Sequence, residues 1–285
     1  MNARKLKFFN SLKISVIILP LFFTACISLP KAEVENRNIC DIFPNKVEWL
    51  QVCDGISYFT FNCEKLIYHV ARIELEESDL KLLYFPDKCV VFKDGAFNSV
   101  NTKTFAKEKQ CILAINACPF NGNLLSSKRE LLGTHVINGT EYGRKISSYA
   151  ALCFRKTSDG YQADIVKSQG FLEEKSFDYA FGGFFQILED GHFIPFKRYR
   201  DSRCGAGLSA DKKILYILVC EGEVPSVSEG LTFEECACIF NALGAFNALE
   251  FDGGASAELY LGSKSLLSYK QKRVQASSFG FAKIN

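Results

Sequence analysis

The chain has 285 residues, of which 48% are hydrophobic, enough to bury the core of one large domain or two small ones and too many for a disordered chain or a coiled coil. Its 34 basic and 32 acidic residues nearly balance, which excludes a general attraction to nucleic acid or to anionic lipid. An anionic ligand would have to be held by a local site.

The N-terminus is typical of an exported protein. Basic residues precede an apolar run at residues 14–23, which is too short to span a membrane as a helix. The following Phe-Thr-Ala-Cys resembles a bacterial lipobox and predicts lipidation of Cys26, with a plain secreted protein or a retained anchor as alternatives. We expect a lipid-anchored protein of the cell envelope with three parts: a lipoprotein signal peptide at 1–25, a tether at 26–39 and a domain at 40–285.

Cysteine usage is unusual for an exported chain. If Cys26 carries lipid, eleven cysteines remain, so at least one is unpaired within the chain. Three near the start of the domain are close enough in sequence to bridge, whereas several others lie in apolar runs, where a free thiol acts as a small hydrophobe. We expect mostly free thiols. Cys236 and Cys238 have the wrong spacing for a redox pair or a common zinc site, and we expect no metal and no cofactor.

Beyond residue 46 the sequence is dominated by strand patterns. The predicted strands are 47–50, 55–61, 66–75, 80–85, 111–116, 133–139, 149–154 and 181–188, with a short helix at 102–110. Asp190-Gly191 predicts a tight hairpin. His69 lies in one of these strands and is expected to be a satisfied or edge-facing histidine.

Two polar side chains are candidates for the rim of a site. Asn116 ends an apolar strand and is followed by Pro119 and an Asn-Gly pair, so it is either delivered to the rim of a site or caps its own turn. Arg203 closes a basic stretch and is followed by Cys-Gly-Ala-Gly, whose small residues would leave room for an anion beside the guanidinium. The alternative for the basic stretch is a solvated face.

Residues 213–220 form the strongest strand pattern, and the clearest helix follows it. Thr232 and Glu235 have the spacing of a capping box, and Gly244 fits the C-terminal cap. A strand at 245–251 then leads to Asp252, Gly253 and Gly254.

Asp252 is the most conspicuous candidate in the chain. Glycines allow backbone N–H groups to approach an anion or a sugar, and Ser256 adds a hydroxyl group. Glu258 is a second carboxylate, in what is predicted to be a strand. The alternative is an ordinary glycine turn with a solvated Asp.

These segments, in this order, resemble the phosphodiester glycosidase family. The residues that carry the resemblance are Arg203-Cys-Gly-Ala-Gly, Gly230-Leu-Thr-Phe-Glu-Glu, Asp252-Gly-Gly-Ala-Ser, Ile115-Asn-Ala-Cys-Pro-Phe and, more weakly, Arg273-Val274. Family members typically carry Arg-Thr-Ala-Ile-Gly, Gly-Leu-Thr-Leu-x-Glu, Asp-Gly-Gly-Gly-Ser and Ile-Asn-Gly-Gly-Phe-Phe. The departures at Ala117, Cys118, Cys204 and Ala255 are expected to narrow the pocket or to change its partner.

The resemblance implies a single α+β domain with a mixed or antiparallel sheet core, few helices, and hydrolysis of a sugar-1-phosphodiester. Asp252, Arg203 and Asn116 are then the expected catalytic residues, with Arg203 at the phosphate. The residues expected to bind substrate are Gly253, Gly254, Ser256, Glu258 and Arg273. The alternatives are a surface lipoprotein that binds a glycan or cell-wall polymer without cleaving it, and a metal-dependent phosphodiesterase.

Overall fold

The computed structural model describes residues 32–123, 126–173, 176–271 and 273–284. The helices in these ranges are α1 (Ile39–Ile42), α2 (Thr102–Glu108) and α3 (Phe233–Ala242), with short 3-10 turns at Gln169–Phe171 and Gly254–Ser256. The rest of the regular structure is β-sheet. The predicted α+β class with a largely antiparallel core and few helices is confirmed, since every pairing between named strands is antiparallel.

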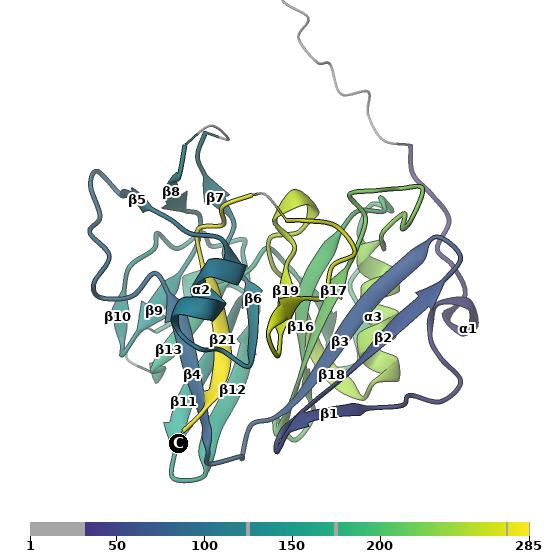
Figure 1. Cartoon of the computed structure of the whole chain (residues 1–285), viewed down its shortest axis with the longest axis horizontal. Helices are drawn as coiled ribbons and strands as arrows, with labels where there is room; N and C mark the ends of the chain where they lie inside the picture. The colour runs from purple at the N-terminus through teal and green to yellow at the C-terminus, as the bar shows by residue number, and fades with distance from the viewer. Residues whose placement is uncertain (1–31, 124–125, 174–175, 272, 285) are drawn as a thin grey trace, which may run out of the picture. The chain divides into compact units, whose positions relative to one another are not determined.

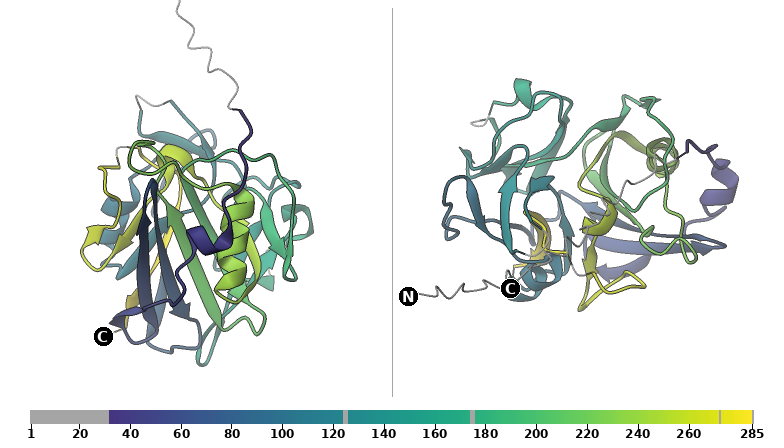
Figure 2. Two further views of the ribbon diagram at one scale, coloured as in Figure 1. Left: turned by 90° about the vertical axis from the view of Figure 1, so that its right-hand side faces the viewer. Right: turned by 90° about the horizontal axis from the view of Figure 1, so that it is seen from above.

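An eight-stranded sheet forms one half of the domain (Figure 1). Its strands, in spatial order, are β1 (Leu50–Cys53), β2 (Ile56–Cys63), β3 (Leu66–Glu74), β17 (Ile214–Cys220), β16 (Arg203–Ser209), β18 (Ala245–Glu250), β14 (Gln186–Glu189) and β15 (His192–Phe193). Helix α3 covers one face of the sheet, and α1 lies against α3 (Figure 2, left).

Three smaller sheets form the other half. One contains β10 (Thr140–Glu141), β9 (His135–Ile137), β13 (Tyr179–Gly182), β11 (Ala151–Thr157) and β12 (Gly160–Val166). The second contains β20 (Lys264–Ser265), β19 (Leu259–Leu261), β6 (Leu113–Asn116), β21 (Ser278–Lys283) and β4 (Leu80–Phe85). The third contains β5 (Ala96–Asn98), β8 (Lys128–Leu131) and β7 (Phe120–Asn121).

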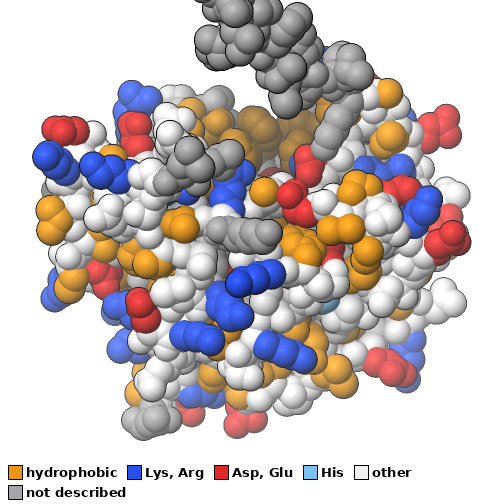
Figure 3. All heavy atoms as spheres, turned by 45° about the horizontal axis from the view of Figure 1, so that its top comes forward, with side chains coloured by type: hydrophobic (Ala, Val, Ile, Leu, Met, Phe, Trp, Pro, Cys, Tyr) orange, Lys and Arg blue, Asp and Glu red, His pale blue; other side chains and the backbone are white. Residues whose placement is uncertain are grey.

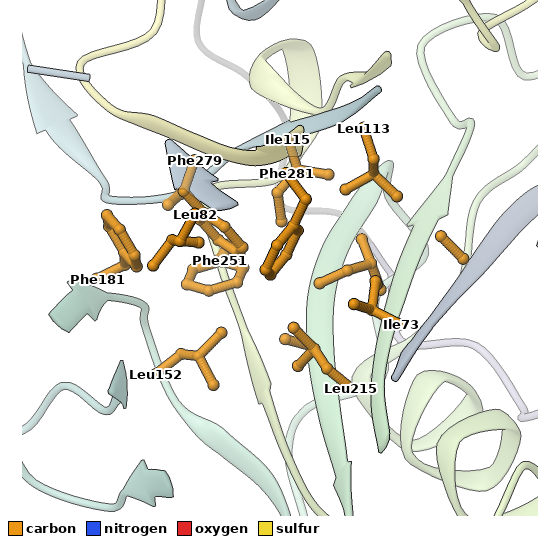
Figure 4. Close-up of a cluster of buried hydrophobic side chains, with 14 of the residues drawn as sticks. Ile73, Leu82, Leu113, Ile115, Leu152, Phe181, Leu215, Phe251, Phe279 and Phe281 are labelled. Atoms are coloured by element: carbon orange, nitrogen blue, oxygen red, sulfur yellow. The ribbon is translucent and has the colours of Figure 1, made fainter. Parts of the chain in front are cut away.

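The main hydrophobic core lies between the eight-stranded sheet and the two five-stranded sheets (Figure 4). Phe279 of the last strand stacks on Phe181, with ring centroids 4.7 Å apart, and meets the ring of Phe251 edge-on at 5.7 Å. Each of these three aromatic rings comes from a different sheet or sheet end and is at most 1% exposed. Burial of this aromatic surface therefore fixes how the sheets pack.

A second core lies under α3 on the opposite face of the eight-stranded sheet. The capping box is present as predicted: the Thr232 hydroxyl accepts from the Glu235 N–H at 3.0 Å, and the Glu235 carboxylate accepts from the Thr232 N–H at 2.9 Å. Gly244 follows the helix with a φ of +93°, a conformation that favours glycine at a helix C-terminus.

One predicted strand was wrong. The run at 181–188 is not one strand, because β13 and β14 belong to different sheets; a Cβ on Gly183 between them would lie 2.5 Å from the Glu250 carbonyl oxygen. Residues of the tether predicted at 26–39 contact the domain. Val34 donates to the Arg198 carbonyl at 3.0 Å, and Arg37 contacts the carboxylates of Glu229 and Glu235.

All eleven cysteines of the described ranges are free thiols, as expected. Within the same ranges, no helix is long and apolar enough to cross a membrane. The predicted signal peptide and the lipidation site at Cys26 lie outside the described residues and stay predictions.

Candidate active site

The turn that begins at Asp252 lies where the eight-stranded sheet passes into a five-stranded one, between β18 and β19. The backbone N–H of Asp252 donates to the carbonyl of Ala117 at 2.9 Å, and that of Gly254 donates to the carbonyl of Ser202 at 2.9 Å. A Cβ on Gly253 would lie 2.6 Å from the Ser202 oxygen, and Gly254 has a φ of +55°. The two glycines are therefore required by close backbone packing and by a left-handed conformation.

The Asn116 side chain hydrogen-bonds to both ends of this turn. Its Nδ2 donates to the Asp252 carbonyl at 2.6 Å, and its Oδ1 accepts from the Glu258 N–H at 3.0 Å. The side chain is 0% exposed. Asn116 was predicted to be a catalytic residue or to cap its own turn; in the structure its side chain bridges the two ends of the Asp252 turn.

Glu258 is directed away from Asp252. Its carboxylate accepts from the Ser265 hydroxyl, and burial raises its pKa above the ordinary value. The side chain is 1% exposed. Glu258 was predicted to lie in a strand, but it precedes β19 (Leu259–Leu261), and its carboxylate is buried in the protein.

Asp252 itself has the electrostatic character of a reactive group. Burial raises its pKa to about 6, while the Ser256 hydroxyl and the positive charge of Arg273 oppose that rise. The carboxylate is consequently ionised at neutral pH and more basic than an exposed aspartate. Ser256 and Arg273, which lower the pKa of Asp252, were both predicted to bind substrate. The fold therefore brings these two predicted residues close to Asp252.

The Arg203 side chain makes its contacts within the protein. Its Nε donates to the Leu231 carbonyl at 2.8 Å, its Nη2 donates to the Tyr199 carbonyl, and the guanidinium carbon lies 3.9 Å from the centroid of the Phe233 ring. The guanidinium therefore stacks at the N-terminus of α3. The predicted placement of Arg203 at a substrate phosphate is not what this geometry favours.

The glycines after Arg203 serve helix packing. A Cβ on Gly207 would lie 2.6 Å from the Phe240 ring, and one on Gly205 would lie 3.3 Å from it. The small residues of this strand thus leave room for an aromatic side chain of α3 rather than for an anion.

Glu250 is a buried carboxylate next to this packing. It is 1% exposed, and burial raises its pKa to about 7, although Arg203 and the neighbouring Cys236 oppose the rise. In the folded state it keeps its proton to a higher pH than in the unfolded chain, so the stability of the protein falls as the pH rises from about 4.5 to about 7.

Glu250→Gln is therefore expected to stabilise the protein at pH 8, by on the order of 3 kcal/mol, because it removes the cost of ionising a buried group. At pH 4 both states are protonated, and the variant should match wild type. Urea unfolding at the two pH values measures the difference. Glu64→Gln, on an exposed residue, is the control and should show no pH-dependent gain; an equal gain at pH 4 and pH 8 for Glu250→Gln would contradict this explanation.

A pocket of about 500 Å³ opens beside the turn. The residues that line it are Arg129, Glu223, Ala255, Tyr269, Lys270, Gln271, Arg273 and Val274. Ala255 is the residue that the turn contributes to the lining. Asp252 is not a lining residue, but the charge of Arg273, which is one, acts on its carboxylate. Lys and Arg side chains gather near the centre of the face seen in Figure 3, which looks toward the upper end of the molecule in Figure 1.

The wall of the pocket is held by a buried polar network. His69 contacts Thr60 through Nδ1 at 2.9 Å and Glu221 through Nε2 at 3.2 Å. Glu221 also accepts from the backbone N–H and hydroxyl of Ser268, next to Tyr269. Burial opposes ionisation of Glu221, but these hydrogen bonds outweigh it and lower its pKa. His69 is thus a satisfied histidine, as expected, and it supports the pocket indirectly.

Most of the residues that depart from the family motifs are buried in hydrophobic cores. Ala117, Cys118 and Cys204 are at most 1% exposed and pack into hydrophobic clusters. They do not narrow the pocket, contrary to expectation. Ala255 is the one departure that lines it.

Five lining residues were missed in the sequence: Arg129, Glu223, Tyr269, Lys270 and Gln271. Arg129 had a usable signal, since strand β8 alternates exposed and buried positions and places this arginine in phase with Leu131, on the buried side. Tyr269 and Gln271 lie in an irregular loop, where no period indicates direction.

In the described ranges, no group of three or more His, Cys, Asp or Glu side chains is placed to hold a metal ion.

Comparison with known proteins gives a family and a fold. The model of the phosphodiester glycosidase family matches residues 109–281, more than half of the chain. No curated protein sequence matches significantly. Among solved structures, the catalytic domain of zebrafish N-acetylglucosamine-1-phosphodiester alpha-N-acetylglucosaminidase, auto-inhibited by its pro-peptide, is 16% identical with a TM-score of 0.60, covering 80% of this chain and 83% of that one.

Two bacterial structures share the same fold. A hypothetical protein from Synechocystis is 15% identical with a TM-score of 0.56, covering 84% of this chain and 64% of that one. A putative exported protein from Burkholderia pseudomallei is 13% identical with a TM-score of 0.56, covering 76% of this chain and 74% of that one.

Proposed function

The chain belongs to the phosphodiester glycosidase family, and on that premise we propose that it hydrolyses a sugar-1-phosphodiester to free sugar and a phosphomonoester. The observation that carries the proposal is the turn at Asp252, which puts an ionised, partly buried carboxylate beside a pocket lined by Arg273. This substrate class pairs an electrophilic anomeric carbon with a phosphate anion. Asp252, in the turn beside the pocket, suits the anomeric carbon, and Arg273, in the pocket lining, suits the anion.

The chemistry suits a site with a single prominent carboxylate. In a sugar-1-phosphodiester the anomeric carbon bears a phosphate ester, which is already a good leaving group and needs little protonation. Cleavage breaks the bond between the anomeric carbon and the bridging oxygen, which leaves with the electron pair on the phosphate. Water supplies the new anomeric hydroxyl, and its remaining proton passes to a base or to solvent.

Asp252 is the group that acts at the anomeric carbon. Because its carboxylate is ionised at neutral pH, it can take the proton from the attacking water or attack the anomeric carbon itself. The two routes give opposite stereochemistry, since a covalent intermediate retains the anomeric configuration and direct attack by water inverts it. The anomer first released, read by NMR, distinguishes them.

The test is turnover of a panel of sugar-1-phosphate diesters by the purified protein, with free sugar and phosphomonoester both quantified. The proposal expects both products in equal amounts and full activity in EDTA. Activity lost in EDTA and restored by a divalent metal would instead support a metal-dependent phosphodiesterase. Binding to a glycan array with no product from any diester would support the non-catalytic lipoprotein.

The pH dependence of kcat/KM follows from the raised pKa of Asp252, which lies at about 6. Only the ionised carboxylate is active, so kcat/KM is expected to be level above about pH 7 and to fall by up to tenfold per pH unit below about 6. Initial rates between pH 4.5 and 8, with circular dichroism to show that the fold persists, measure this profile. A constant kcat/KM down to about pH 5 would contradict the assignment.

A location in the cell envelope, with a lipid on Cys26 and a substrate outside the cytoplasm, remains part of the same proposal.

A further inference from the structure

Two arginines from distant parts of the chain share one aromatic ring at the pocket. The guanidinium carbon of Arg129, on β8, lies 5.0 Å from the centroid of the Phe120 ring, and that of Arg273, just before β21, lies 5.4 Å from it. Both arginines line the pocket beside Ala255. The fold therefore brings two positive charges to one side of the cavity next to the Asp252 turn.

Arg129 is held rigidly by backbone carbonyls. Its Nε donates to Val274 at 2.8 Å, and its Nη1 donates to Asn123 at 3.1 Å, Ser126 at 2.7 Å and Lys128 at 2.8 Å. The side chain is only 2% exposed. Gly122 leaves room for the Arg129 side chain, since a Cβ at residue 122 would lie 2.9 Å from that side chain. One nitrogen, Nη2, makes no hydrogen bond to any described residue.

Neither arginine of the pair makes an ion pair within the described ranges. Arg37, Arg72 and Arg155 each contact a carboxylate within 4 Å, whereas neither Arg129 nor Arg273 does among the residues that the structure places. The Nε of Arg273 is buried and has no hydrogen-bond partner there. Burial, and then the charge of Arg273, lower the pKa of Arg129.

Two adjacent guanidinium groups that make no close ion pair destabilise the folded protein, because like charges repel and buried charge is poorly solvated. An anion in the pocket removes both costs. A phosphoryl group suits the arrangement, since guanidinium N–H groups donate to its oxygens in a fixed, planar geometry.

We propose that Arg129 and Arg273 form the phosphoryl subsite of the pocket, with Arg129 Nη2 and the guanidinium group of Arg273 as donors. The assignment to a substrate rests on the proposed function, because it places the phosphate of a sugar-1-phosphodiester against the arginine pair and the anomeric carbon toward Asp252. It replaces Arg203 in that role. Arg129 and Arg273 then select charged phosphodiesters over neutral glycosides, and their charge stabilises the departing phosphate.

The test is direct binding of inorganic phosphate to the purified protein by isothermal titration calorimetry, at constant ionic strength. Wild type should bind phosphate and gain thermal stability from it. Arg273→Gln should raise the phosphate Kd at least tenfold, and Arg129→Gln should do the same if it folds. Lys128→Gln removes an equal charge from the exposed neighbour of Arg129, and its Kd should stay within about threefold of wild type.

The outcomes separate this inference from the proposed function. No phosphate binding by wild type, or equal binding by wild type and Arg273→Gln, overturns the subsite even if the enzyme is active. Binding that depends on Arg273, together with no turnover of any diester, leaves the subsite standing and overturns the proposed function. A Kd that rises as much in Lys128→Gln as in Arg273→Gln shows general charge attraction and also overturns the subsite.

Discussion

Asp252→Asn is expected to lower kcat/KM for a sugar-1-phosphodiester by on the order of 10²–10⁴-fold. The amide has almost the size of the carboxylate, but it can neither accept a proton from water nor attack the anomeric carbon. The backbone N–H and carbonyl of Asp252, which fix the turn, are unchanged by the substitution. The fold should therefore persist, and the melting temperature with initial rates on the same preparation separates lost chemistry from lost structure.

Asp159→Asn is the matched control for this variant. Asp159 lies in an exposed turn between β11 and β12, away from the Asp252 turn, so the same chemical change there should leave the rate within about twofold of wild type. If Asp252→Asn retains the rate of Asp159→Asn, the carboxylate is not part of the chemistry.

Asn116→Ala has the largest expected effect on stability, a loss of about 2–5 kcal/mol in the free energy of unfolding. The substitution leaves the Asp252 carbonyl and the Glu258 N–H without their buried partner, and each unsatisfied group costs its desolvation. Because the same bonds set the path of the turn, activity should fall further than stability alone explains. Urea unfolding and kcat/KM, measured where the variant is fully folded, give both quantities.

Asn121→Ala provides the comparison. Asn121 is exposed on β7, five residues beyond Asn116, and its loss should cost no more than about 0.5 kcal/mol. An Asn116→Ala variant as stable as Asn121→Ala would show that the turn does not depend on these two bonds.

Local sequence patterns predicted most of the fold, because each depends on neighbouring residues only. The capping box of α3, the Asp190-Gly191 hairpin and the apolar strand now seen as β17 all follow rules of that kind. The sequence could not indicate which strands share a sheet. Continuous apolar character from residue 181 to 188 concealed a crossing between sheets at Gly183.

The site was predicted in part for the same reason. Asp252 ends a strand, and strand ends are visible in sequence. The direction of the Arg203 side chain is not visible in sequence. It depends on which face of the eight-stranded sheet α3 covers, because Arg203 stacks on Phe233 of that helix. Arg129 and Arg273 lie far apart in sequence and meet only because β8 and the segment before β21 flank Phe120.

The path of oxygen from solvent into product tests the proposed chemistry most directly. The purified protein is incubated with a sugar-1-phosphodiester in water enriched in oxygen-18, and the released sugar and phosphomonoester are analysed by mass spectrometry. Attack at the anomeric carbon, assisted by Asp252 and by the charge of Arg129 and Arg273, predicts label in the sugar and none in the phosphate. Label in the phosphate and none in the sugar would contradict it, because water would then have attacked phosphorus.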